Sequence, residues 1–143
     1  MKSKCVNDGT EKTFVLILDE GDDPMSILTD FAGKQNITAG KFTAIGAFKR
    51  AVVGYYDMSS QEYKKIPVDE QVEVLSLIGD IACREDEPKV HAHVVLGRSD
   101  GTVRGGHLIE ASVRPTLEIV LVESPGYLRR RMDPRSGLAL IAL

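Results

Sequence analysis

The pattern of hydrophobic and polar positions along the chain predicts one helix close to the N-terminus. The apolar run Thr13–Asp19 has the length and composition of a buried strand. Asp23 followed by Pro24 is a typical helix start, with an N-cap carboxylate and proline at the first helical position. Apolar residues then recur at helical spacing to about Gln35, at Met25, Leu28, Phe31 and Ala32. We therefore expect an amphipathic helix that packs its apolar stripe on a core.

Strand patterns dominate the remainder of the chain. Apolar or alternating stretches bounded by turn residues predict strands over Lys41–Phe48, Ala51–Met58, Tyr63–Val68, Gln71–Arg84, Val90–Gly97, Thr102–Val113 and Thr116–Glu123. Most of these stretches are separated by short turns, which favours antiparallel pairing. The sequence thus predicts an α+β fold, a compact single domain with a mostly antiparallel β-sheet and a packed N-terminal helix.

The two ends of the chain differ from this pattern. We assign residues 1–11 to a flexible N-terminal tail and residues 12–143 to the domain. Pro125–Gly137 is interpreted as a basic loop, and Leu138–Leu143 as an uncharged apolar tail. A tail of this kind is expected to add an edge strand or to pack into a neighbouring subunit, which favours an oligomer.

Composition narrows the class of protein. Among 143 residues, 43% are hydrophobic, which is enough for one core. The chain has neither an apolar run long enough for a membrane span nor the N-terminal pattern of a signal peptide, so we expect a cytoplasmic location. The formal net charge of −3 provides no general attraction for nucleic acid or for anionic membranes. Cys5 and Cys83 have neither zinc-site nor redox-motif spacing.

All three histidines of the chain, His91, His93 and His107, lie close together in the sequence. Three neutral imidazoles can supply the three nitrogen ligands of an open zinc site. A hairpin with the three-residue loop Ser99–Gly101 would place His93 opposite His107 and His91 diagonal to it, with all three rings on one face.

Other interpretations of the histidines stay open. A two-residue loop would send His107 to the opposite face unless Gly105 and Gly106 form a bulge. Independently of the loop length, the histidines could be hydrogen-bonded residues of a partial core, or they could line a metal-free pocket for an anion or substrate. Imidazole also accepts nickel and cobalt, so the residues favour zinc without selecting it.

The histidines belong to a wider set of motifs. These are Glu73–Ala82 (EVLSLIGDIA), His91–His93 and Gly105–Glu110 (GGHLIE), together with Tyr55–Asp57, Tyr63 and Thr116–Glu118. In combination they resemble the plants-and-prokaryotes conserved (PPC) domain family, over about residues 12–123. The resemblance implies a compact fold of helix and sheet, a trimer, and a histidine cluster that can hold a metal, zinc foremost.

The resemblance also carries a DNA-binding label. In plants this domain is joined to AT-hook segments that bind AT-rich DNA, and bacterial single-domain members are commonly called DNA-binding by analogy. This chain has no Arg-Gly-Arg-Pro hook and its charge balance is acidic. Its local support for DNA binding is a basic segment that could contact phosphates, Arg129, Arg130, Arg131 and Arg135, although basic runs are commonly solvated.

Three functions follow from these observations. The first is a homotrimeric metal-binding protein that binds or transforms a small molecule; Glu73 is then the candidate general acid or base, because it shares a predicted strand face with Leu75 and Leu77. A structural Glu73 paired with an arginine is the alternative for this residue. The second function is DNA binding or transcriptional regulation, and the third is a non-catalytic assembly module with a structural metal.

Overall fold

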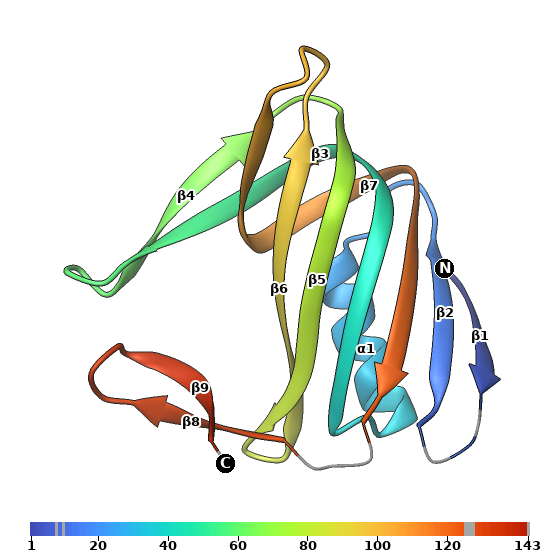
Figure 1. Ribbon diagram of the computed structural model, residues 1–143, viewed down its shortest axis with the longest axis vertical. Coiled ribbons are helices and arrows are strands. Elements are labelled where there is room, and N and C mark those ends of the chain that lie inside the picture. The colour runs from blue at the N-terminus through green and yellow to red at the C-terminus, as the bar shows by residue number, and fades with distance from the viewer. Residues whose placement is uncertain (8, 10, 125–127, 143) are drawn as a thin grey trace.

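The computed structural model describes residues 1–7, 9, 11–124 and 128–142. One helix, α1 (Pro24–Gln35), lies against a large curved sheet (Figure 1). In the described part of the chain the sheet has nine strands: β1 (Lys2–Asn7), β2 (Thr13–Leu18), β3 (Ala39–Asp57), β4 (Glu62–Val68), β5 (Val72–Arg84), β6 (Glu87–Gly97), β7 (Val103–Glu123), β8 (Arg129–Asp133) and β9 (Leu138–Ala142).

The sheet folds back on itself around its long strands. Its order is β1-β2-β7-β3-β5-β8-β9, with β4 paired to β3 and β6 paired to both β5 and β7. Because β3 also pairs with β5 and β7, the strands β3, β5, β6 and β7 form a closed ring in which each pairs with the next. Nearly all pairs are antiparallel, and β8 joins β5 in parallel at a single position. The predicted α+β class with a mostly antiparallel sheet is confirmed.

Helix α1 begins and ends as its sequence indicates. Asp23 caps it by accepting a hydrogen bond from the Ser26 backbone N–H at 2.8 Å. The other carboxylate oxygen of Asp23 accepts from the Ala111 backbone N–H at 2.9 Å, which ties the start of the helix to β7. The helix buries Leu28, Phe31 and Ala32 in the core, where Phe31 packs edge-on against Phe14. The helix does not have the length and hydrophobicity needed to span a membrane.

Two pairs of predicted strands are single strands in the structure. The stretches predicted over 41–48 and 51–58 merge into β3, and those over 102–113 and 116–123 merge into β7. The pairing of β3 with β7 shifts register at several points, between Gly46 and Phe48 among others. Bulges of this kind bend a strand without ending it, which is why polar and proline positions did not mark true turns.

Both ends of the chain add strands to the sheet. The segment expected to be a tail contains β1, which pairs antiparallel with β2. The segment expected to be a basic loop contains β8, and the apolar tail forms β9 in a hairpin with it. The expectation that the C-terminal segment adds an edge strand is therefore confirmed over 138–142, whereas Leu143 and residues 125–127 lie outside the described residues.

Candidate metal centre

The hairpin of β6 and β7 has the register that the three-residue loop predicts. His93 pairs with His107, and the register continues to Gly97 opposite Val103. In the loop, Gly101 has a φ of 81°, and its N–H donates to the Arg98 carbonyl at 2.9 Å. Glycine takes this left-handed conformation without steric cost. The loop length thus fixes the face from which His107 projects.

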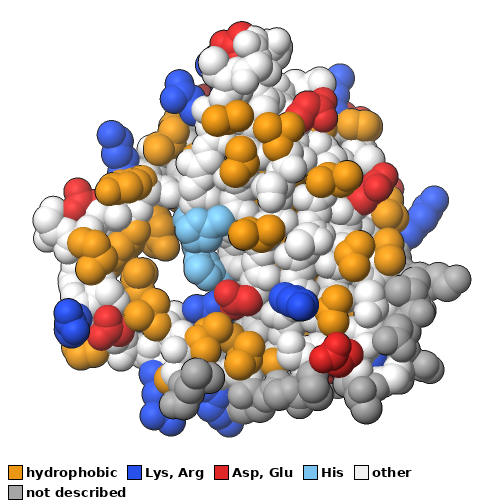
Figure 2. Space-filling model, viewed as in Figure 1, with side chains coloured by type: hydrophobic (Ala, Val, Ile, Leu, Met, Phe, Trp, Pro, Cys, Tyr) orange, Lys and Arg blue, Asp and Glu red, His pale blue; other side chains and the backbone are white. Residues whose placement is uncertain are grey.

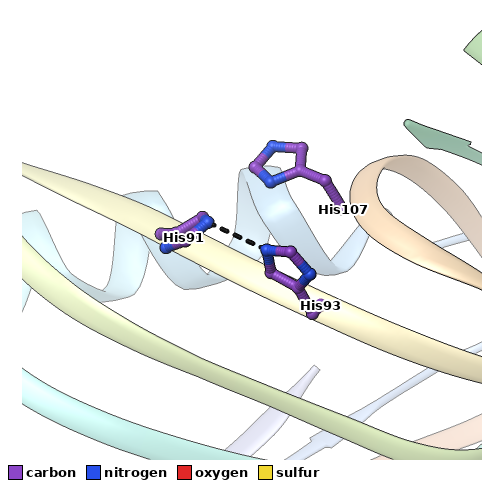
Figure 3. Close-up of side chains that lie close together, drawn as sticks. All are labelled: His91, His93 and His107. Atoms are coloured by element: carbon purple, nitrogen blue, oxygen red, sulfur yellow. Dashed lines mark hydrogen bonds between the residues drawn. The ribbon is translucent and has the colours of Figure 1, made fainter. Parts of the chain in front are cut away.

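The three imidazole rings converge above this hairpin (Figure 3). Their ring centroids are 5.0 Å apart for His91 and His93, 5.1 Å for His91 and His107, and 5.5 Å for His93 and His107. One nitrogen from each ring lies within 4.8 Å of the other two, and the Nε2 atoms of His91 and His93 are 3.2 Å apart. The structure therefore brings together the three histidines that the sequence singled out, in a group that could hold a metal ion.

The chemistry of the donor atoms fits a divalent cation. In His107 the nitrogen that faces the other two rings is Nδ1, the ring nitrogen bonded to Cγ (Figure 3). This atom is buried and has no hydrogen-bond partner among the described residues. Burial, with the charges of His91 and His93, lowers the pKa of His107 to about 4. Burial and His91 also lower the pKa of His93. Unprotonated imidazoles are the form that binds metal.

A carboxylate on β5 holds the first histidine in place. Asp80 pairs with His91 across β5 and β6, and its Oδ2 lies 3.5 Å from Nδ1 of His91. Its Oδ1 accepts a hydrogen bond from Nη2 of Arg130 on β8. Burial opposes ionisation, but the hydrogen bond from His91 and the charge of Arg130 outweigh it and lower the pKa of Asp80. Carboxylates in this position fix the tautomer and orientation of metal-binding histidines.

Sequence reasoning placed Asp80 and Tyr63 within the family motifs but assigned neither of them to the histidine site. Tyr63, on β4, lies against His107 with ring centroids 4.8 Å apart. The available signal for Asp80 was its place in an apolar strand, the same kind of signal that drew attention to Glu73. Only the pairing of β5 with β6 shows which of these two carboxylates lies opposite a histidine.

The structure does not bring Glu73 to the histidines. Glu73 is exposed and pairs with Gly97, at the far end of the β5–β6 ladder from Asp80. At a rise of about 3.3 Å per residue, the two carboxylates are on the order of 20 Å apart along β5. The expected shared face with Leu77 is also wrong, since a bulge between Val74 and Ser76 leaves Leu75 exposed but Leu77 buried.

The basic segment does not present its four arginines together. Arg130 has only 9% of its side chain exposed and is engaged by Asp80 and by the Ala139 carbonyl. Arg129 is exposed and lies 3.0 Å from an Asp86 carboxylate oxygen. Arg131 and Arg135 are exposed. Since side chains alternate along a strand, Arg129 and Arg131 share one face of β8 and Arg130 projects from the other.

Fold and site together define a compact, mostly β protein with a three-histidine cluster beside its sheet. The chain belongs to the Plants and Prokaryotes Conserved (PCC) domain family, whose model matches residues 6–125. This is the PPC family that the motifs resemble, so the resemblance is confirmed. A search among curated proteins found no match.

Solved structures with this fold include close relatives. A PPC protein from Pyrococcus horikoshii is 36% identical, with a TM-score of 0.86 over 92% of this chain and 91% of that chain. A metal-containing protein from Archaeoglobus fulgidus is 38% identical, with a TM-score of 0.86 over 92% and 94%. A protein from Ralstonia eutropha, named as a candidate DNA-binding protein, is 27% identical, with a TM-score of 0.85 over 91% and 90%.

Proposed function

We propose that this chain is a homotrimeric PPC-domain protein whose three histidines hold a zinc ion that binds, or helps to transform, a small molecule. The observation that carries the proposal is the convergence of His91, His93 and His107, with one nitrogen from each within 4.8 Å of the others. The metal content named for the Archaeoglobus fulgidus relative, at 38% identity, supports it.

Three neutral nitrogen donors suit an ion that retains an open position for a further ligand. A zinc ion bound in this way polarises its ligand and lowers the pKa of a bound water to about 7. His91, His93 and His107 would hold the ion, and Asp80 would keep His91 oriented towards it. Nickel and cobalt satisfy the same donor set, with zinc the favoured ion.

Binding is the activity that the neighbouring residues support best. Two cavities adjoin the histidines, and Asp80 is the one carboxylate among the described residues that line them. Asp80 is itself in contact with Arg130 and His91. A carboxylate held in this way orients a ligand and is a poor proton shuttle. Glu73, the acid or base expected from the sequence, would have to act from the opposite end of β5.

The trimer is supported by an apolar area on the outer face of the sheet. Five large hydrophobic side chains are exposed there: Ile45, Leu75, Ile78, Val95 and Val120. Figure 2 shows hydrophobic groups spread over the face that carries the histidines, and Ile78 lines a cavity together with His91 and His93. Extended exposed apolar surface commonly marks an interface. Light scattering would test the assembly: a trimeric mass that Ile78→Glu reduces supports it, and a monomeric wild type contradicts it.

Metal content tests the centre. Zinc is measured in protein purified without a histidine tag, for the wild type and for a His91→Ala/His107→Ala double variant. We expect about one zinc per chain in the wild type and a near-complete loss in the double variant. Glu73→Gln serves as the control and retains the metal. Equal zinc in the wild type and the double variant would overturn the proposal.

DNA binding is a second candidate function. It is favoured by the exposed Arg129, Arg131 and Arg135 at the C-terminal hairpin and by the name of the Ralstonia eutropha relative. Phosphate contacts by these side chains would make binding strongly salt-dependent. Retention on generic duplex DNA at low salt, reduced in an Arg129→Gln/Arg131→Gln/Arg135→Gln variant, supports this function. No retention at low salt contradicts it.

A further inference from the structure

A cavity of about 240 Å³ opens directly beside the histidines. His91 and His107 line one end of it, and the described residues also include three basic side chains in its lining, those of Arg84, Lys89 and Arg130. Figure 2 shows the surface hollowed next to the histidines. A molecule in this cavity would therefore touch the metal ligands and the basic residues at the same time.

The rest of the cavity wall is apolar. Tyr63, Val90, Leu138 and Leu140 line it, the first from β4 and the last two from β9. The β3–β4 hairpin and the β8–β9 hairpin lie on the same side of the molecule (Figure 1), and hydrogen bonds join their tips. The Tyr56 hydroxyl donates to the Ser136 carbonyl at 2.6 Å, and the Gln61 amide donates to the Arg135 carbonyl at 3.2 Å. The β3–β4 hairpin and the β8–β9 hairpin thus enclose the cavity from two sides.

Among the described residues, the charged side chains that line the cavity are all basic, and their carboxylate partners lie outside the lining. Arg130 is neutralised by Asp80, but no carboxylate belongs to the described lining. Lys89 meets Glu87 at 2.8 Å and Arg84 meets Glu85 at 3.7 Å, with the glutamate side chains 73% and 86% exposed. Exposed pairs of this kind contribute little free energy, so both cations can turn to a ligand.

A metal centre built from neutral donors would add a positive charge beside these basic side chains. Three imidazoles leave a divalent ion with its full charge, and Asp80, the carboxylate beside His91, is already shared with Arg130. A ligand that fills the open coordination position therefore gains most if it is an anion. The cavity volume is that of roughly eight water-sized atoms. Lys89 and Arg84 lie where a second polar group of the ligand would reach them.

We infer that the small molecule bound at the centre is an organic carboxylate of about six to eight non-hydrogen atoms. One carboxylate oxygen takes the open position of the metal, the apolar part lies on Tyr63 and Leu140, and Lys89 and Arg84 bind the remaining polar end. This inference rests on the proposed metal site and adds the class of ligand to it.

The test uses protein loaded with Co²⁺, whose visible absorption reports changes in its ligands. Cobalt content is measured first. Pyruvate, lactate and succinate are then titrated at constant ionic strength, with succinamide as a neutral molecule of the same size as succinate and inorganic phosphate as a separate arm. We expect at least one carboxylate, but not succinamide, to change the spectrum at saturable concentrations.

Matched variants connect the response to the cavity. In Arg84→Gln/Lys89→Gln we expect the half-saturating concentration to rise about tenfold, which corresponds to roughly 1.4 kcal/mol. Lys64→Gln/Arg104→Gln removes two exposed charges outside the cavity and leaves that concentration unchanged.

The outcomes separate the two proposals. A protein that takes up no cobalt overturns the metal site and the ligand class together. Full cobalt loading with no response to any carboxylate, an equal response to succinamide, or a response to phosphate alone overturns the ligand class and leaves the metal site standing. If the two double variants change the half-saturating concentration equally, Arg84 and Lys89 are not part of the binding site, and this result also overturns the inference.

Discussion

Asp80 and His91 face each other across neighbouring strands, with a carboxylate oxygen 3.5 Å from Nδ1 of the imidazole. This contact occupies the nitrogen of His91 that points away from His93 and leaves Nε2 directed towards the other rings. The second carboxylate oxygen is held by Arg130. The orientation of His91 on β6 is therefore linked, through one carboxylate, to the C-terminal hairpin.

Replacing Asp80 with Asn should weaken zinc binding tenfold to a hundredfold, the usual effect of losing the partner of a metal-binding histidine. The amide keeps the shape of the carboxylate but loses its charge, so it holds the His91 ring and the Arg130 guanidinium less firmly. Competition with a chromophoric chelator measures the affinity. Asp57→Asn, which alters an exposed carboxylate bonded to Ser59, is the control. Unchanged affinity in Asp80→Asn would refute this role.

Arg130→Gln should lower the free energy of unfolding by about 1–3 kcal/mol, because it removes a charged partner of Asp80 and leaves the Ala139 carbonyl without its donor. Urea denaturation measures the change. Arg131→Gln, at an exposed position on the same strand, should change stability by less than about 0.5 kcal/mol. In an Asp80→Asn background the Arg130 substitution should cost less, and strict additivity would show that the two residues do not interact.

Gly79 permits the close approach of two strands beside the centre. A Cβ there would overlap the ring of Phe42 and the carbonyl oxygen of His91. Gly79→Ala should therefore destabilise the fold by about 1–3 kcal/mol and also weaken zinc binding, because His91 has to move. Thermal unfolding and zinc titration measure the two effects.

The matched control is another glycine, Gly33 in α1. A Cβ at Gly33 meets no atom within 4 Å, so Gly33→Ala should stabilise the protein by about 0.5–1 kcal/mol. Similar behaviour of the two alanine variants would show that the space around Gly79 is not restrictive.

The metal-free protein should lose stability as the pH falls from about 6.5 towards about 4. His107 has a pKa of about 4 in the folded chain, against 6.5 for an unperturbed histidine, because it is buried and lies beside His91 and His93. Between these pH values the unfolded chain binds a proton that the folded chain does not, so acidification favours unfolding. Melting temperatures at pH 7 and pH 4.5 measure this loss. The loss should be smaller in His107→Gln, and an equal loss would contradict the assignment.

The sequence close to the histidines was sufficient to predict how their side chains are grouped. The loop from Ser99 to Gly101 sets the register of one hairpin, and strand alternation then places His91, His93 and His107 on one face. The same holds for α1, whose cap and apolar stripe lie within a dozen residues. These features depend on neighbours in the chain, so spacing and residue type suffice to predict them.

The partners of that cluster were decided by the tertiary structure. Asp80 and Tyr63 contact the histidines, and Arg130 contacts Asp80. Their approach depends on how β5, β4 and β8 pair. A bulge in β5 changes which side chains share a face, and so it was pairing, not the apolar pattern around Glu73, that selected the carboxylate at the centre. Register across distant strands follows from the packing of the whole sheet, which no single segment encodes.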